Sequence, residues 1–301
     1  VWNIYTFFDT YASIDKPVFA TRSLEGLSLT PVDRWLVIRT NDYIAKATAC
    51  YEDYKSYLQV REFETFVDDI SNWYIRTNRR RFWKAEDEAD KDVAYRVLFF
   101  ALDACVRTMA PVIPFMTEKI WQELTRKVLP DAAISVHLSG WPQPMPGFED
   151  DGIIEQTALA RDVIAAAMRL RNEQQLKVRQ PLRSMAVCCS PDAAAKIRVF
   201  EKNILDELNV KRVEYLEDTS SLEDIRLSVN FKAAGAVLKG EVNRFKAALE
   251  QAGSDQMADM AAQYRAGGPV RVPGFDEAFD IGLFNSNAVT KTGIVLSESA
   301  M

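Results

Sequence analysis

The chain has 301 residues, of which 48% are hydrophobic and 27% charged, so it can bury the core of one or two globular domains without a metal or disulfide staple. Its net charge of −6 excludes a surface that is basic throughout, so any contact with nucleic acid has to come from local clusters of Lys and Arg. One histidine, His137, and four cysteines without CxxC spacing argue against the common zinc sites and favour a reducing compartment.

The chain begins Val1-Trp2-Asn3, without an initiating Met or a signal peptide, which predicts the interior of a longer protein. No apolar run reaches the roughly 18 residues of a membrane span, so we expect a soluble, cytoplasmic protein without a membrane partner.

The first half of the chain predicts consecutive helices. Aromatic residues crowd residues 1–20, and Pro31 begins a second segment with helical spacing of its apolar residues. Further helices are predicted over residues 58–84 and 91–128, with short links between them. Consecutive helices with short links pack as an antiparallel bundle, which we expect over residues 1–145.

Residues 139–152 contain three prolines and three glycines and predict a domain boundary. The segments that follow mix helices with short β-prone runs, which favours a small mixed α/β (α+β) domain over residues 150–301. The predicted helices there are residues 153–175, 193–208 and 240–251, and the predicted strands are 184–189, 210–216 and 225–229. The tail after Gly267 is β-prone, and the fold class as a whole is mainly α.

The most informative stretch lies within residues 70–85, which hold five basic side chains and no acid. At about 100° per residue, Phe66, Ile70 and Tyr74 fall on one helix face, which we assign to the core. The opposite face carries Arg76, Arg79 and Trp83, with Arg80 at its edge and Lys84 at the end of the stretch. Guanidinium groups pair with phosphate and an exposed indole stacks on an unpaired base, so these five residues are candidate RNA contacts.

Two plainer interpretations stay open for this stretch. The cations can form a solvated face that pairs with the acidic run over residues 86–92, and Trp83 can be a core residue. Arg81 lies at the angle of the core face, so we expect a structural role for it, paired with a buried acid or placed beyond the helix end.

A second basic cluster spans the end of the predicted helix over residues 153–175 and the segment after it: Arg169, Arg171, Lys177, Arg179 and Arg183. Glu173 is the only acid between residues 163 and 191. Its candidate RNA contacts are Arg171, Lys177 and Arg179. The alternative is a solvated helix end, where cations are favoured by the helix dipole. No spacing of residues predicts a catalytic or metal site.

At these residues the chain resembles class I aminoacyl-tRNA synthetases, and within them the isoleucyl family. Six segments carry the resemblance in the family's order: VWNIYTFFDTYA (1–12), DRWLVIRTN (33–41), FVDDISNWYIRTNRRRFW (66–83), MAPVIPFMTEKIWQEL (109–124), SVHLSGWP (135–142) and LRNEQQLKVRQPL (170–182). The third and sixth are closer to the isoleucyl family than to its valyl or leucyl relatives. Residues after about 230 match the family poorly.

The resemblance implies an anticodon-binding helix bundle followed by a small junction domain. Its implied partner is an isoleucine tRNA, bound by the anticodon stem and loop for an isoleucine–tRNA ligase that uses ATP and Mg. The class I two-histidine signature is absent, because His137 is the only histidine, and no Lys-Met-Ser-Lys-Ser-like loop occurs. We therefore expect catalytic and editing domains upstream in the same chain, and no cofactor or catalytic activity in these 301 residues alone.

Two alternatives to this interpretation stay open. One is the equivalent part of a valyl or other class I synthetase. The other is a helical protein-interaction scaffold without an RNA role.

Overall fold

The computed structural model describes residues 1–19, 21–83, 87–150, 152–217 and 223–290. The chain divides into two compact units: residues 1–167, 178–184 and 192–213 form unit 1, and residues 168–177, 185–191 and 214–301 form unit 2. The expected fold class is confirmed, since the chain is mainly helical with small two-stranded sheets. The division into domains at 145–150 stays a prediction.

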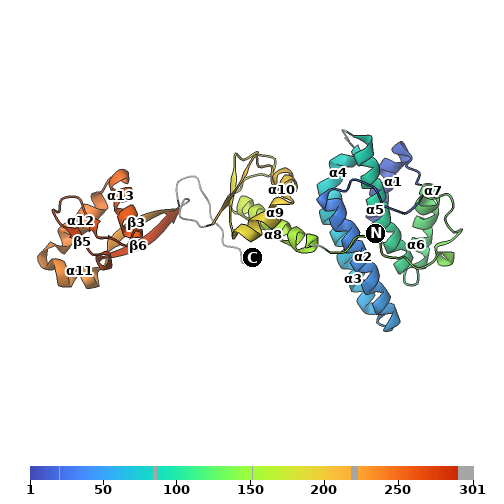
Figure 1. Ribbon diagram of the computed structural model, residues 1–301, viewed down its shortest axis with the longest axis horizontal. Coiled ribbons are helices and arrows are strands. Elements are labelled where there is room, and N and C mark those ends of the chain that lie inside the picture. Colours follow the sequence, from blue (N-terminus) through green and yellow to red (C-terminus); the bar gives the residue numbers. More distant parts are fainter. Residues whose placement is uncertain (20, 84–86, 151, 218–222, 291–301) are drawn as a thin grey trace. The chain divides into compact units, whose positions relative to one another are not determined.

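Unit 1 begins with the predicted run of helices (Figure 1). They are α1 (Trp2–Asp15), α2 (Pro31–Glu52), α3 (Ser56–Asp68), α4 (Arg76–Trp83), α5 (Glu88–Met109), α6 (Pro114–Ile120) and α7 (Arg126–Val128). Segments of π-helix, Asp69–Ile75 and Trp121–Thr125, join α3 to α4 and α6 to α7. The helices predicted from residue 58 and from residue 91 are thus confirmed, each with a π-helical segment inside it.

The start of α2 shows why the sequence signals were reliable. Pro31 occupies the first helical position, where its missing N–H costs no hydrogen bond. Thr30 caps the helix, and its hydroxyl accepts from the backbone N–H of Asp33 while the Asp33 carboxylate accepts from the backbone N–H of Thr30. The first turn of α2 is therefore fixed, together with the buried carboxylate that it carries.

Aromatic side chains fill the core of the bundle. Tyr43 of α2 stacks on Phe66 of α3 with ring centroids 4.3 Å apart, and Phe82 of α4 meets the edge of Tyr95 of α5 at 5.2 Å. Trp121 is fully buried, and its indole N–H donates to the carbonyl of Ala133. Such closely packed rings hold α3 and α4 in fixed positions on the bundle.

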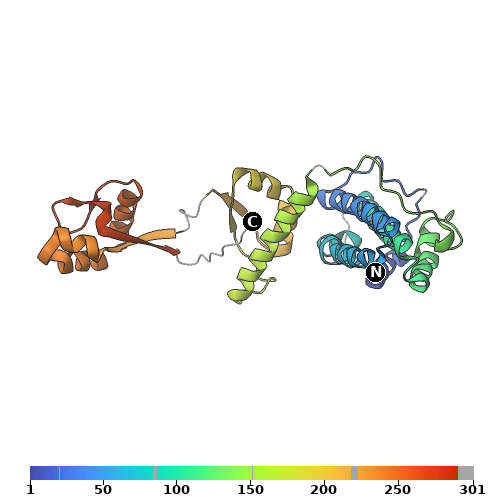
Figure 2. The ribbon, with the colours of Figure 1, turned by 90° about the horizontal axis from the view of Figure 1, so that it is seen from below.

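After the bundle, α8 (Ile153–Glu173) is one long helix, seen in yellow-green in Figure 2. The helix predicted over 193–208 is two helices, α9 (Pro191–Arg198) and α10 (Glu201–Leu208). They break at Phe200, which is fully buried and packs with Trp73 at a centroid distance of 6.5 Å. Burial of this ring against the π-helical segment prevails over the continuous helical pattern of the sequence.

Unit 2 contains two short sheets and one long ribbon. Strand β1 (Met185–Cys188) pairs with β2 (Val213–Leu216), of which residues 214–216 belong to this unit. The ribbon pairs β3 (Glu223–Val229) with β6 (Phe284–Thr290) in antiparallel register, and β4 (Val270–Arg271) pairs with β5 (Ala278–Phe279) (Figure 1). The strand predicted over 225–229 and the β-prone tail up to residue 290 are confirmed.

Three helices pack on this ribbon around Phe245: α11 (Phe231–Leu238), α12 (Val242–Gln251) and α13 (Ser254–Arg265). Only α12 was predicted. Helices α11 and α13 are rich in alanine and carry only three large apolar residues each, so their helical spacing is a weak signal in the sequence. Across the described part of the chain, no helix is both long enough and apolar enough to cross a membrane.

Candidate nucleic-acid interface

The arginine-rich stretch lies where α3 passes through π-helix into α4. The wider π-helical turn shifts the following helix, and Trp73, Tyr74, Asn78 and Phe82 become its buried side. The exposed side then carries Arg76, Arg79, Arg80 and Trp83, which we call the α4 face. The structure therefore brings four of the five predicted residues together, and Lys84 lies outside the described residues.

The side chains of the α4 face are open to solvent. Trp83 keeps 61% of its surface exposed, so the alternative of a core tryptophan is wrong. Arg79 and Arg80 are exposed and form no ion pair with any residue that the structure describes. A hollow of about 380 Å³ lies beside Arg79, between the π-helical segment and α1, where Phe7 and Tyr11 line it. The face thus offers cations and an indole beside a partly aromatic recess.

Arg76 differs from its neighbours because it already has an anionic partner. Its Nη2 atom lies 2.8 Å from Oε2 of Glu207 on α10, although the arginine side chain remains 56% exposed. An RNA phosphate would have to displace this carboxylate. No feature of the sequence pointed to Glu207, which lies 131 residues further along the chain.

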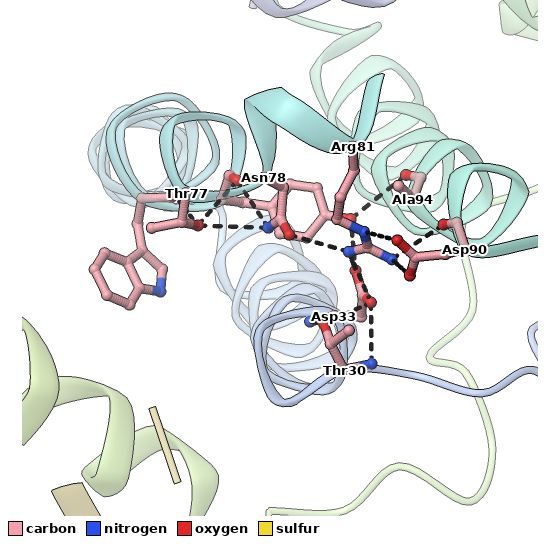
Figure 3. A network of polar contacts seen from close by, with 9 residues as sticks. Thr30, Asp33, Thr77, Asn78, Arg81, Asp90 and Ala94 are labelled. Atoms are coloured by element: carbon pink, nitrogen blue, oxygen red, sulfur yellow. Dashed lines mark hydrogen bonds and ion pairs between the residues drawn. The ribbon is translucent and has the colours of Figure 1, made fainter. Parts of the chain in front are cut away.

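Arg81 points the other way, into the bundle, and holds α4 in place (Figure 3). Its Nη1 atom contacts both carboxylate oxygens of Asp33 at 2.9 and 3.0 Å, and its Nε and Nη2 atoms donate to Asp90 at 2.9 and 2.7 Å. Asn78 accepts from the same guanidinium at 3.0 Å, and the Tyr74 hydroxyl donates to Asp33 at 2.7 Å. The expected pairing of Arg81 with a buried acid is confirmed.

In this network the arginine remains charged and the tyrosine remains neutral. Burial alone would lower the pKa of Arg81, but the attraction of Asp33 and the hydrogen bonds to Asp33 and Asp90 raise it, so the guanidinium remains protonated. Burial, and then the negative charge of Asp33, raise the pKa of Tyr74 well above its usual value, so the phenol remains a donor. The start of α2, the start of α5 and α4 are thereby joined at one point.

A second network, missed by the sequence analysis, fixes the π-helical segment. Asp69 accepts from Arg39 of α2 at 3.0 Å and from Arg161 of α8 at 2.7 Å, and Arg39 also binds Glu62 at 2.7 Å. The guanidinium of Arg161 lies over the Trp73 ring, 5.8 Å from its centroid. Trp73 itself is buried.

The second basic cluster contains one buried arginine. Arg171 is only 3% exposed, and its Nη1 atom donates to the carbonyl of Lys177 at 3.1 Å, so little of its guanidinium is open to RNA. Lys177 and Arg179 are exposed, but they fall in different units, and their contact with RNA stays a prediction. Within the described residues, no group of three His, Cys, Asp or Glu side chains is arranged to hold a metal ion.

Comparison with known proteins gives the α4 face a context. A family described as the anticodon-binding domain of tRNA ligase matches residues 33–186, which include α4. The isoleucine–tRNA ligase of Thermus thermophilus is 36% identical over 254 residues, which is 83% of this chain and 24% of that protein. Isoleucine–tRNA ligases of Cytophaga hutchinsonii and Treponema pallidum are 36% and 33% identical over 77% and 86% of the chain, and over 21% and 25% of their own lengths. The chain thus spans about a quarter of the length of these relatives.

Proposed function

Since the chain belongs to the family of anticodon-binding domains of tRNA ligases, we propose that it binds the anticodon stem and loop of a tRNA through the α4 face. The observation that carries this proposal is the exposure of Arg79, Arg80 and Trp83 on one side of a helix whose other side is fixed by Arg81. Because the backbone of α4 is already fixed, only the side chains of these cations have to be ordered when they bind phosphates, and the indole adds a stacking surface for a loop base.

The tRNA that we propose is the isoleucine tRNA, and the whole protein is an isoleucine–tRNA ligase of the cytoplasm that uses ATP and Mg. This proposal is supported by the names of the chain's relatives, which are isoleucine–tRNA ligases. Catalytic and editing domains would be further parts of the same protein. The role of these 301 residues would then be to position the tRNA while the chemistry takes place elsewhere.

Filter binding with unmodified tRNA transcripts tests this proposal. We expect the chain to retain the isoleucine tRNA more strongly than valine or leucine tRNAs at the same ionic strength. Preference for another tRNA would identify the whole protein as a different synthetase. Absence of binding to all three at low salt would leave the helical scaffold as the better interpretation.

The purified chain should not catalyse isoleucine-dependent exchange of pyrophosphate into ATP. Its only histidine is His137, whereas the class I nucleotide-binding signature needs two, so no ATP site of that type can form. The measurement is radiolabelled pyrophosphate exchange with and without isoleucine, using a full-length isoleucine–tRNA ligase as the positive control. Any exchange above the background without isoleucine would contradict the expectation.

Trp83→Ala should weaken tRNA binding by about five- to a hundredfold, which is the usual value of one base–aromatic stack. Because the indole is mainly exposed, the free energy of unfolding should change by no more than about 0.5 kcal/mol. Affinity and melting temperature are measured on the same samples. Trp83→Phe should recover most of the affinity, and Phe115→Ala, which removes another exposed ring on α6, should leave it unchanged. Equal affinities of Trp83→Ala and the wild-type chain would remove Trp83 from the interface.

A further inference from the structure

Unit 2 has a groove of its own, bounded by the β3–β6 ribbon and by helices α12 and α13. Its volume is about 860 Å³, within the range of ligand sites in proteins. Helix α13 lines it with two small residues, Ala258 and Ala261, one helical turn apart. Leu249 and Met257 add an apolar floor beneath the opening.

Cations and amides surround this apolar floor. Arg226 of β3, Lys246 of α12 and Arg265 of α13 line the groove, and Glu250 is the single carboxylate among its lining residues. Lys246 lies 3.6 Å from Glu250, in a pair whose side chains are both exposed, and such pairs contribute little. The groove therefore keeps an excess of positive charge toward solvent.

The ribbon supplies hydrogen-bonding groups in a regular order. Arg226 pairs in register with Asn287 and Ser228 with Asn285, and all four line the groove. Residues two apart on a strand point to the same face of a sheet, so the Arg226 guanidinium and the Ser228 hydroxyl are neighbours on one face of the ribbon. The Asn285 amide already donates one N–H to the Val229 carbonyl at 3.4 Å, and it keeps a second N–H and its oxygen. Together with the Asn287 amide it offers the donors and acceptors that the edge of a nucleobase requires.

Phe231, at the first position of α11, also lines the groove and keeps 59% of its surface exposed. An exposed ring beside cations and amides is the combination with which proteins bind unpaired nucleotides: bases stack on the ring and phosphates pair with the cations. A small inorganic anion would use neither the ring nor the apolar floor. An acidic peptide would use the cations but not the amide row and the ring together.

We propose that this groove binds one or two unpaired nucleotides of an RNA strand, with a base on Phe231 and phosphates at Arg226 and Lys246. The site belongs to unit 2 and uses no residue of the α4 face. It goes beyond the proposed function, because it requires a single-stranded RNA and no particular tRNA.

Photo-crosslinking of the whole 301-residue chain tests the groove separately from the α4 face. A ten-nucleotide oligouridine that carries 4-thiouridine is irradiated with the chain, and the adducts are mapped by mass spectrometry of peptides. We expect adducts on the peptides that contain Phe231 and Asn285–Asn287. Their yield should fall about tenfold in Arg226→Ala/Lys246→Ala and in Phe231→Ala. Adducts near Trp83 report on the α4 face, so failure of one site is distinguishable from failure of the other.

The matched control is Lys232→Ala/Arg271→Ala, which removes two exposed cations of the same unit that do not line the groove. It should crosslink as the wild-type chain does, and all variants should melt at the wild-type temperature. Adducts that are absent from the groove peptides, or that fall equally in the control, would overturn the proposal. Binding of a fluorescent oligoglutamate peptide that is lost in Arg226→Ala/Lys246→Ala, without oligonucleotide adducts in the groove, would assign the groove to acidic protein segments instead.

Discussion

Replacing Arg81 with Met should lower the free energy of unfolding by about 3–5 kcal/mol, the usual cost of removing one partner of a buried ion pair. The Asp33 carboxylate is fully buried, and Arg81 is its only cationic partner among the described residues. Without the guanidinium, Tyr74 and Thr30 still donate to Asp33, but the negative charge is left unbalanced in the core. Urea unfolding followed by far-UV circular dichroism measures the loss.

A double-mutant cycle separates this interaction from simple loss of packing. Asp33→Asn keeps the shape of the side chain and removes its charge, so Arg81→Met/Asp33→Asn should be more stable than the sum of the single losses predicts, by about 0.5–3 kcal/mol. Arg81→Lys should retain the charge but lose the fork that contacts Asp33 and Asp90 together, with an intermediate loss. Additive losses, or a loss below about 1 kcal/mol for Arg81→Met, would show that the pair does not hold α4.

The role of Arg81 was predictable from the sequence, and its partner was not. At helical spacing its side chain falls on the core face, where a cation requires an acid. The sequence holds 43 acidic residues, and nothing local selects Asp33, which lies 48 positions earlier. The structure fixes that carboxylate in the first turn of α2 through the cap formed by Thr30 and Asp33. The start of α2 was therefore predictable from Pro31, while the pairing of distant helices depended on tertiary packing.

Prediction of the candidate site from the sequence was limited in the same way, because contacts between distant segments were not predictable. Helical spacing correctly put Arg79, Arg80 and Trp83 on one exposed side, because that property depends only on the helix and on which side is apolar. It did not reveal Glu207 beside Arg76, or Arg161 over Trp73, since both contacts bridge segments more than 80 residues apart. It also gave no sign that Arg171 would be buried, because the local sequence around an arginine in a helix does not separate a solvated role from a structural one.

Arg79→Ala/Arg80→Ala should weaken binding of the isoleucine tRNA by about a hundredfold, since one charge-assisted hydrogen bond to phosphate is worth about a factor of ten. The plot of log affinity against log salt concentration should become shallower by about 0.7–0.9 for each phosphate contact that is lost. Arg126→Ala/Lys127→Ala removes two exposed cations of α7 and is the matched control. Unchanged affinity and slope in Arg79→Ala/Arg80→Ala, equal to those of the control, would favour the solvated-face interpretation.

Adding Arg76→Ala to this pair should cost less than either of the other two substitutions, because binding of a phosphate by Arg76 must first break its ion pair with Glu207. Glu207→Gln removes the competing carboxylate and should raise tRNA affinity about two- to fivefold, the value of a partly exposed ion pair. The same substitution in an Arg76→Ala background should have no effect on affinity. If Glu207→Gln raises affinity equally in both backgrounds, the glutamate repels RNA directly and Arg76 does not contact phosphate.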